Sequence, residues 1–223
     1  MNNQGRAALI TGSSRGIGAG IALVMAEEGY SYIGINYAFD EEGAKQTAEE
    51  CRKFGAEVKT FQANVADKYD CKKLLDEFIA WAGKIDVLVN NAGGALKVVN
   101  KGRGFDEITL EYWDEQIALN LSAAAYCSHY AMKDMKARGV KGNIIHTSSV
   151  MSYGAWDRKT LLPYSAAKAG LNEFTCILAN ECAPLGIRVN AVVFLADNEK
   201  ARYIVGQVLL VDGGFGADRG PVE

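Results

Sequence analysis

Residues 7 to 18 decide the fold of this chain, and they read Ala7-Ala8-Leu9-Ile10-Thr11-Gly12-Ser13-Ser14-Arg15-Gly16-Ile17-Gly18. The first four are apolar and predict a short strand, while Gly18–Glu28 predicts a helix that ends at Gly29. Gly12, Gly16 and Gly18 lie in the turn between them. Residues without Cβ let the backbone approach a pyrophosphate, whose charge then meets free N–H groups and the positive end of the helix dipole. Such glycines can also simply make a tight turn, but their place at a first strand-to-helix turn favours dinucleotide binding.

Short apolar runs alternate with amphipathic stretches along the rest of the chain. The expected strands are Tyr32–Asn36, Glu57–Gln62, Val87–Asn90, Asn143–Thr147, Arg188–Val193 and Gln207–Val211. The expected helices are Glu41–Phe54, Lys68–Trp81, Thr109–Met135 and Pro163–Cys182. This alternation predicts an α/β fold, a Rossmann-type doubly wound parallel sheet with helices on both faces and a ligand crevice at the carboxyl ends of the strands. No linker or repeat divides residues 1–223, so a single domain is expected.

Composition and charge exclude several classes of function. The 223 residues carry a net charge of -3, and the basic residues are scattered, so neither nucleic acid nor a membrane surface is an expected partner. Neither a secretory signal nor a membrane-spanning apolar run is expected, and the five cysteines, which form no C-x-x-C pair, favour a reducing, cytoplasmic compartment. Neither histidine, His129 or His146, has a partner at metal-ligand spacing, so no metal is expected and both are interpreted as structural. The five cysteines form no C-x-x-C pair and are expected to be buried thiols: Cys51, Cys71, Cys127, Cys176 and Cys182.

The end of the second strand bears on the choice of cofactor. An acidic residue there would bind the ribose 2′-OH of NAD, but Asn36 and Tyr37 occupy the position and no acid occurs before Asp40. Arg15, in the glycine turn, could instead pair with a 2′-phosphate, because its guanidinium matches the geometry of that group. The sequence therefore favours NADP(H) over NAD(H). Asp40 and the lack of a second basic residue after Asn36 keep NAD(H) open.

Three later segments bring further polar residues in a distinctive order. Asn90-Asn91-Ala92-Gly93 follows the fourth strand, Asn120 lies in the long helix, and Ser149 precedes Tyr164-Ser165-Ala166-Ala167-Lys168. Together with Thr11–Gly18, these motifs resemble the short-chain dehydrogenase/reductase family, and within it the 3-oxoacyl-[acyl-carrier-protein] reductase-like members. The likeness covers nearly the whole chain, including Asn64-Val65 and Val211-Asp212-Gly213-Gly214. A single Y-x-x-x-K is a weak signal, whereas several motifs in the family's order are a strong one.

The chemistry of the pair Tyr164 and Lys168 agrees with that resemblance. The two residues are four apart on a helix, so their side chains share one face. An ammonium beside a phenol favours the phenolate and brings general acid–base catalysis within reach near neutral pH. The resemblance implies that Tyr164 transfers the proton and that Lys168 also holds the nicotinamide ribose. It further implies that Ser149 donates a hydrogen bond to the carbonyl oxygen and that Asn120 holds a proton-relay water. Ser148 is the alternative to Ser149.

The function implied is hydride transfer between NADP(H) and a carbonyl or secondary alcohol, such as a 3-oxoacyl thioester. An NAD-dependent alcohol, sugar or steroid dehydrogenase is the alternative, and a catalytically retired cofactor-binding regulator is an alternative of another class. The resemblance also implies a homo-oligomer, a tetramer or a dimer. The expected cofactor-binding residues are Gly12, Ser14, Arg15, Gly16, Ile17, Gly18, Asn36, Tyr37, Asn64, Val65, Asn91, Ala92, Gly93, Tyr164 and Lys168.

One segment departs from the family's pattern. Family members continue after the sixth strand with a Pro-Gly turn and a helical lid over the substrate, whereas here Arg188–Val193 runs directly into Phe194-Leu195-Ala196-Asp197. A few dozen family residues are therefore expected to be missing near 193–194, either because the sequence skips a segment or because of a deletion. The stretch from Ser149 to Tyr164, which runs through Tyr153–Arg158, is slightly longer than is usual in the family and is expected to alter the substrate wall, where Trp156 is a candidate lining residue.

Overall fold

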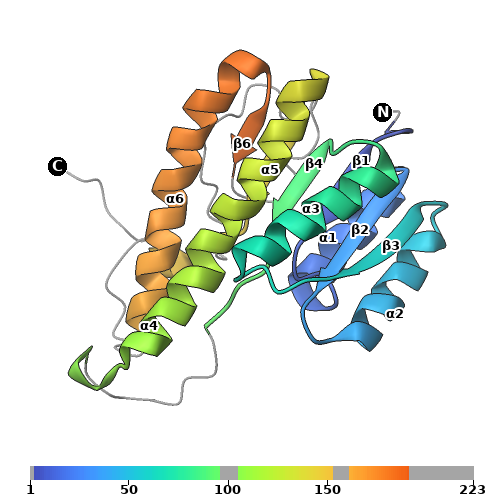
Figure 1. Ribbon diagram of the computed structural model, residues 1–223. Coiled ribbons are helices and arrows are strands. Elements are labelled where there is room, and N and C mark those ends of the chain that lie inside the picture. The colour runs from blue at the N-terminus through green and yellow to red at the C-terminus, as the bar shows by residue number, and fades with distance from the viewer. Residues whose placement is uncertain (1–2, 96–104, 153–160, 191–223) are drawn as a thin grey trace, which may run out of the picture.

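The protein contains a six-stranded parallel sheet, seen in a computed structural model that describes residues 3–95, 105–152 and 161–190 (Figure 1). The strand order is β3-β2-β1-β4-β5-β6, so the chain moves outward from β1 in one direction and then returns to continue on the other side. This confirms the predicted Rossmann-type fold. The strands are β1 (Ala7–Ile10), β2 (Tyr32–Tyr37), β3 (Glu57–Gln62), β4 (Val87–Asn90), β5 (Asn143–His146) and β6 (Arg188–Asn190).

Helices cover both faces of the sheet, which explains why its central strands, β1 and β4, are buried along their whole length. Side chains alternate along a strand, so Ala7 and Leu9 of β1 pack into one hydrophobic cluster and Ala8 and Ile10 into the other. The first cluster lies under α3 (Lys68–Ala82), α5 (Ala123–Arg138) and α6 (Leu162–Cys182). The second lies under α1 (Gly16–Glu27) and α2 (Glu41–Arg52). No helix among the described residues is long and apolar enough to cross a membrane.

The stretch Thr109–Met135, expected as one helix, contains an irregular turn. After the 3-10 turn η1 (Phe105–Glu107), the structure has α4 (Leu110–Ile117), a π-helical turn η2 (Ala118–Ser122) and then α5. In the π turn the N–H of Ala123 reaches the carbonyl of Ala118, five residues earlier. Asn120 Nδ2 donates a hydrogen bond at 3.1 Å to the backbone carbonyl of Gln116, four residues before it. This side-chain hydrogen bond competes with the regular helical one, which is the physical reason for the local widening.

Smaller differences concern the ends of elements. β2 extends one residue beyond the prediction to Tyr37, while β5 ends at His146, one residue earlier than predicted. α6 is followed by the 3-10 turn η5 (Ala183–Leu185). The predicted strand Gln207–Val211, the segment near 193–194 and the loop with Trp156 lie outside the described residues.

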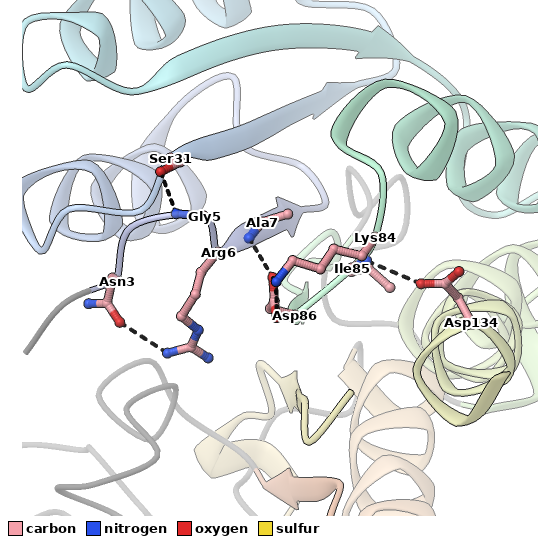
Figure 2. Close-up of polar contacts among 9 residues, drawn as sticks. All are labelled: Asn3, Gly5, Arg6, Ala7, Ser31, Lys84, Ile85, Asp86 and Asp134. Atoms are coloured by element: carbon pink, nitrogen blue, oxygen red, sulfur yellow. Dashed lines mark hydrogen bonds and ion pairs between the residues drawn. The ribbon is translucent and has the colours of Figure 1, made fainter. Parts of the chain in front are cut away.

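A cluster of polar contacts ties the strands together at their amino ends, opposite the predicted crevice (Figure 2). Asp86, at the start of β4, accepts a hydrogen bond from the N–H of Ala7 at 2.8 Å and pairs with Lys84 at 3.2 Å. Its own carbonyl accepts the N–H of Asn143 at 2.9 Å. Asp134 on α5 accepts the N–H of Ile85 at 3.2 Å. The first residues of β1, β4 and β5 are therefore fixed by one buried carboxylate and its backbone.

We expect Asp86→Leu to lower the free energy of unfolding by about 1–3 kcal/mol, because it leaves the buried N–H of Ala7 without an acceptor. Asp86→Asn retains an oxygen at that place and is expected to cost less. Denaturant unfolding measures both. Asp76→Ala, which removes the exposed pair with Lys72, is the control and should change stability by less than about 0.5 kcal/mol. Equal effects of Asp86→Leu and Asp76→Ala would contradict the role of Asp86.

Candidate active site

A cavity of about 610 Å³ lies at the carboxyl ends of β1, β2 and β4, where the sheet topology predicts a ligand site. Eight of the predicted cofactor-binding residues line it: Gly12, Ser14, Arg15, Tyr37, Asn64, Asn91, Ala92 and Gly93. The remaining wall comes from Ala38, Phe39, Asp40, Ala66, Glu115, Ala118 and Leu119. The cavity is therefore bounded by the glycine turn after β1, the ends of β2, β3 and β4 with the residues that follow them, the end of α4 and the beginning of the π turn.

The glycine turn packs tightly against the loop after β4. Gly12 has φ +61°, and a methyl group there would lie 2.8 Å from the Cα of Ala92. A methyl group on Gly18 would lie 2.5 Å from the carbonyl of Gly12. Asn91 Nδ2 donates to the carbonyls of Thr11 and Gly12, both at 3.0 Å, while the Thr11 hydroxyl accepts the N–H groups of Asn91 and Ala92. The glycines are thus required by close backbone approach, and the amide of Asn91 is used to hold the turn.

Five predicted cofactor residues near the turn do not line the cavity. Asn36 is buried, accepts the N–H of Gly12 at 3.1 Å and donates to the carbonyls of Phe61 and Ala63. Its carboxamide is therefore occupied in supporting the turn from beneath. Val65 packs into the core. The other three, Gly16, Ile17 and Gly18, belong to the first turn of α1.

Arg15 and Asp40 place opposite charges at the wall of the cavity. Arg15 Nη1 lies 3.9 Å from Asp40 Oδ2, and the arginine side chain is 85% exposed. Asp40 is held by a second role, since its other oxygen accepts the N–H of Gly43 at 3.1 Å and caps α2. A phosphate beside Arg15 would therefore compete with a carboxylate that is fixed in place.

Helix α6 carries the predicted catalytic pair. It begins at Leu162 with Pro163 in its first turn, the helical position that tolerates proline best. The Nζ of Lys168 lies 5.9 Å from the centre of the Tyr164 ring and donates to the carbonyl of Thr147 at 2.7 Å. Lys168 is 3% exposed, and this burial lowers its pKa from 10.5 to about 8.

Gly93 is the point at which the catalytic candidates meet. A methyl group on Gly93 would lie 2.8 Å from Asn120 Oδ1 and 3.2 Å from Lys168 Nζ. Asn120 is fixed to the same loop, since its oxygen accepts the N–H of Gly94 at 2.8 Å and its nitrogen donates to the Gly94 carbonyl at 3.1 Å. The structure thus brings Asn120, Lys168 and Tyr164 together from the π turn and α6, beside the cavity that Gly93 lines.

The two adjacent serines after β5 differ in their partners. Ser148 donates to Asn172 on α6, and Asn172 in turn donates to Ser152 at 2.8 Å. Ser149 accepts the N–H of Met151 at 3.2 Å, and its hydroxyl has no acceptor among the described residues. Within the described residues the hydroxyl proton of Ser149 is therefore unused, whereas that of Ser148 is bonded to Asn172.

A buried histidine lies below this site. His146 contacts the hydroxyls of Thr175 at 2.8 Å and Ser128 at 3.2 Å through its two ring nitrogens. Burial, with a smaller effect of Lys168, lowers its pKa to about 3. Thr175 donates to the carbonyl of Leu171, so it accepts from His146 Nδ1–H, and the neutral ring links α6 to α5. This arrangement agrees with the structural role predicted for His146.

Sequence reasoning missed two residues that hold the site together. Thr11 supplies the hydroxyl that binds the loop after β4, and Gln116 supplies a carboxamide oxygen 3.0 Å from Asn120 Nδ2. Gln116 lies four residues before Asn120, so helical spacing alone would have marked it as a neighbour. Thr11 gave no comparable signal, because a polar residue at the end of a strand has many uses.

Comparison with known proteins assigns a family to this arrangement. The family model described as short chain dehydrogenase matches residues 6–194. The 3-oxoacyl-[acyl-carrier-protein] reductase FabG of Staphylococcus aureus is 34% identical over 250 residues, covering 94% of this chain and 98% of its own. The 2-dehydro-3-deoxy-D-gluconate 5-dehydrogenase of Pseudoalteromonas atlantica is 31% identical over 254 residues, covering 95% and 96%. Both alignments run longer than this chain, so they contain positions at which it has no residue.

Solved structures show the same fold. The acetoin dehydrogenase YohF of Salmonella typhimurium superimposes with a TM-score of 0.87 at 28% identity and covers 96% of this chain and 98% of its own. A short-chain dehydrogenase/reductase of unknown function from Caenorhabditis elegans, solved with cofactor, gives 0.88 at 27% identity and covers 97% of both chains.

The buried ammonium of Lys168 predicts a pH-dependent stability of the cofactor-free protein. Because its folded pKa of about 8 lies below the usual 10.5, the charge costs folding free energy below pH 8, and that cost disappears as pH rises towards 10.5. Lys168→Met should therefore raise stability by roughly 1–3 kcal/mol at pH 7 and by much less at pH 10. Thermal unfolding of both proteins at the two pH values measures this. A stability difference that does not change with pH would contradict it.

Proposed function

The chain belongs to the short-chain dehydrogenase family, and we propose that it interconverts a substrate carbonyl and the corresponding secondary alcohol with NADP(H) as the favoured cofactor. The similarity to its relatives shows that it is an oxidoreductase acting on CH–OH groups. The observation that carries the proposal is the convergence of Asn120 and Lys168 on Gly93, with Tyr164 beside Lys168, at one wall of the 610 Å³ cavity.

The residues at the glycine turn fit a dinucleotide. Helix α1 starts without a side-chain cap and without an acidic residue in its first turn, whereas α2 and α3 are capped by Asp40 and Asp67. The first N–H groups of α1 are therefore left for an anion such as a pyrophosphate. Ser14, Asn64 and Ala92 would line the adenosine and phosphate part of the site, and Tyr164 and Lys168 the nicotinamide part. When bound, the nicotinamide would supply or accept the hydride.

The chain's own residues would transfer the proton to the substrate oxygen and stabilise the negative charge that develops. In the reductive direction the Tyr164 hydroxyl gives its proton to the carbonyl oxygen, while Ser149 donates a hydrogen bond to the same oxygen. The Lys168 ammonium stabilises the phenolate that forms, and its hydrogen bond to Thr147 keeps it in position. In the oxidative direction the same groups act in reverse.

The substrate is proposed to be a ketone, with a 3-oxoacyl thioester as the first choice because FabG is among the similar proteins. An NAD-dependent alcohol, sugar or steroid dehydrogenase is the second candidate, favoured by the carboxylate of Asp40 at the cavity wall. A retired regulator fits less well, since Ser149, Tyr164 and Lys168 are all in place. A homo-oligomer, tetramer or dimer, and a cytoplasmic location are part of the same proposal.

Variants of Arg15 and Asp40 test the choice of cofactor. We expect the protein to bind NADPH more tightly than NADH. Arg15→Gln should weaken NADPH binding by about 10- to 100-fold through loss of a charge-assisted contact, with little effect on NADH. Asp40→Asn should strengthen NADPH binding, because asparagine still caps α2 but no longer repels a phosphate. Fluorescence titration of the parent protein and both variants with NADPH and with NADH gives these affinities. Tighter NADH binding by the parent protein, unchanged in Arg15→Gln, would favour the NAD-dependent alternative.

Tyr164→Phe tests the assigned proton transfer. The variant should lose at least about 99% of turnover, since general acid–base catalysis contributes about 10²- to 10⁴-fold, and it should bind cofactor as before. A panel of 3-oxoacyl thioesters, sugars and small ketones, followed by nicotinamide absorbance with NADPH and NADH separately, supplies the assay. Comparable activity of the variant would refute the role of Tyr164. Cofactor binding without turnover of any compound by the parent protein would favour the regulator.

A further inference from the structure

The hydrogen bonds between α6 and the loop after β5 all run in one direction. The carbonyl of Ser149 can only accept, so the Ser152 hydroxyl donates to it, at 2.6 Å. A hydroxyl has one hydrogen, and Ser152 must therefore accept from Asn172, whose Nδ2 lies 2.8 Å away. The amide oxygen of Asn172 then faces Ser148, which has to donate. The four groups can be connected in this order only, from Ser148 through Asn172 and Ser152 to the carbonyl of Ser149.

This order gives the two adjacent serines different properties. If Ser148 donated to a substrate, its oxygen would face the oxygen of Asn172 with no hydrogen between them, which costs free energy at a half-buried site. The hydroxyl oxygen of Ser149 is held by the N–H of Met151 at 3.2 Å, and its hydrogen is unused within the described residues. The network therefore favours Ser149 over Ser148 as the donor to a substrate oxygen.

Helix α6 holds the loop after β5 at two points. Asn172 lies four residues after Lys168 and eight after Tyr164, so the three side chains share one side of α6. Lys168 Nζ donates to the carbonyl of Thr147 at 2.7 Å, and Asn172 binds two serines of the same loop. Ser149 lies between these two attachments, and its carbonyl also accepts the N–H of the second serine at 3.1 Å.

We propose that Asn172 is a positioning residue, which sets the place of the Ser149 hydroxyl relative to that of Tyr164 by binding Ser152. The role in catalysis rests on the proposed function. Ser149 and Tyr164 would have to reach one substrate oxygen from two different elements, the loop after β5 and α6. A displacement of about 1 Å between such groups can cost about 100-fold in rate. Asn172 joins the two elements directly and keeps them in register.

Amide hydrogen exchange tests this attachment without any assay of activity. Asn172→Leu keeps the approximate size of the side chain and removes both of its hydrogen-bonding groups. Because the hydroxyl of Ser152 is then released from α6, the N–H groups of Met151 and Ser152, which bind Ser149, should exchange about 10-fold faster. Asn180→Leu makes the same replacement at an exposed position of α6 and should leave both rates unchanged. Unchanged exchange in Asn172→Leu would overturn the proposal.

Steady-state kinetics test the effect on catalysis. Asn172→Leu should lower kcat about 10- to 100-fold with the affinity for the cofactor within about two-fold, because only the donor to the substrate oxygen is displaced. Ser152→Ala removes the link between Asn172 and Ser149 without changing α6, so kcat should fall in the same direction by a smaller factor. Ser152→Thr retains the hydroxyl and should restore kcat. Asn180→Leu is again the control, and thermal unfolding shows whether each variant is folded.

A double-mutant cycle separates positioning from general damage. If Asn172 acts through Ser149, Asn172→Leu should cost nothing further in a Ser149→Ala protein, whose residual rate is followed at high enzyme concentration. A full second loss in that background would overturn the inference. So would an unchanged kcat of Asn172→Leu in a protein that reduces a carbonyl, and the proposed function would then stand. If the parent protein reduces nothing while the exchange rates respond as expected, the proposed function fails and the positioning of Ser149 by Asn172 stands.

Discussion

The contact between the glycine turn and the loop after β4 is the constraint on which the rest of the site depends. Asn91 Nδ2 bridges the carbonyls of Thr11 and Gly12, and the Thr11 hydroxyl receives two N–H groups in return. Four hydrogen bonds therefore join segments separated by about eighty residues. They fix Ala92 against Gly12 so closely that neither glycine in the contact, Gly12 or Gly18, has room for a Cβ. The same loop continues into Gly93, where Asn120 and Lys168 arrive.

Burial determines how the charged groups near this loop behave. Lys168 is almost completely buried, so few water molecules can hydrate its ammonium, and its pKa is lowered to about 8. The neighbouring His146 is neutral, and its hydrogen bonds to Thr175 and Ser128 join α6 to α5 without adding a second positive charge. The arrangement fits a lysine that exchanges protons near neutral pH. Its cost in folding free energy is offset by hydrophobic packing on both faces of the sheet.

Stability and chemistry are separated along the strands. The amino ends of β1, β4 and β5 are fastened by Asp86 and Asp134 (Figure 2). The carboxyl ends of β1, β2 and β4 instead open onto the cavity, which is lined by the largely exposed side chain of Arg15. Ser149, in the loop after β5, donates to no acceptor among the described residues. A parallel sheet makes this division possible, because all of its strands end on the same side.

Local patterns in the sequence were sufficient to predict the fold and to place Tyr164 and Lys168 near each other on one helix. Apolar runs of four to six residues gave the strands β1 to β5 to within one residue, and the spacing of Tyr164 and Lys168 placed both on one helix face. Both depend on neighbours within a few positions along the chain. The uses of Asn36, Asn91 and Gln116 could not be obtained in this way.

Only the tertiary structure decided which polar groups form hydrogen bonds within the fold and which remain free to bind ligands. The sequence predicts that Asn36 binds the cofactor, but its carboxamide is hydrogen-bonded to the backbone of Gly12, Phe61 and Ala63. The π turn at Asn120 depends on the loop at Gly94 as well as on the helix itself. The physical reason is that a hydrogen bond saturates its donor. Whether an amide is free is settled by partners far away in sequence, which no local pattern reveals.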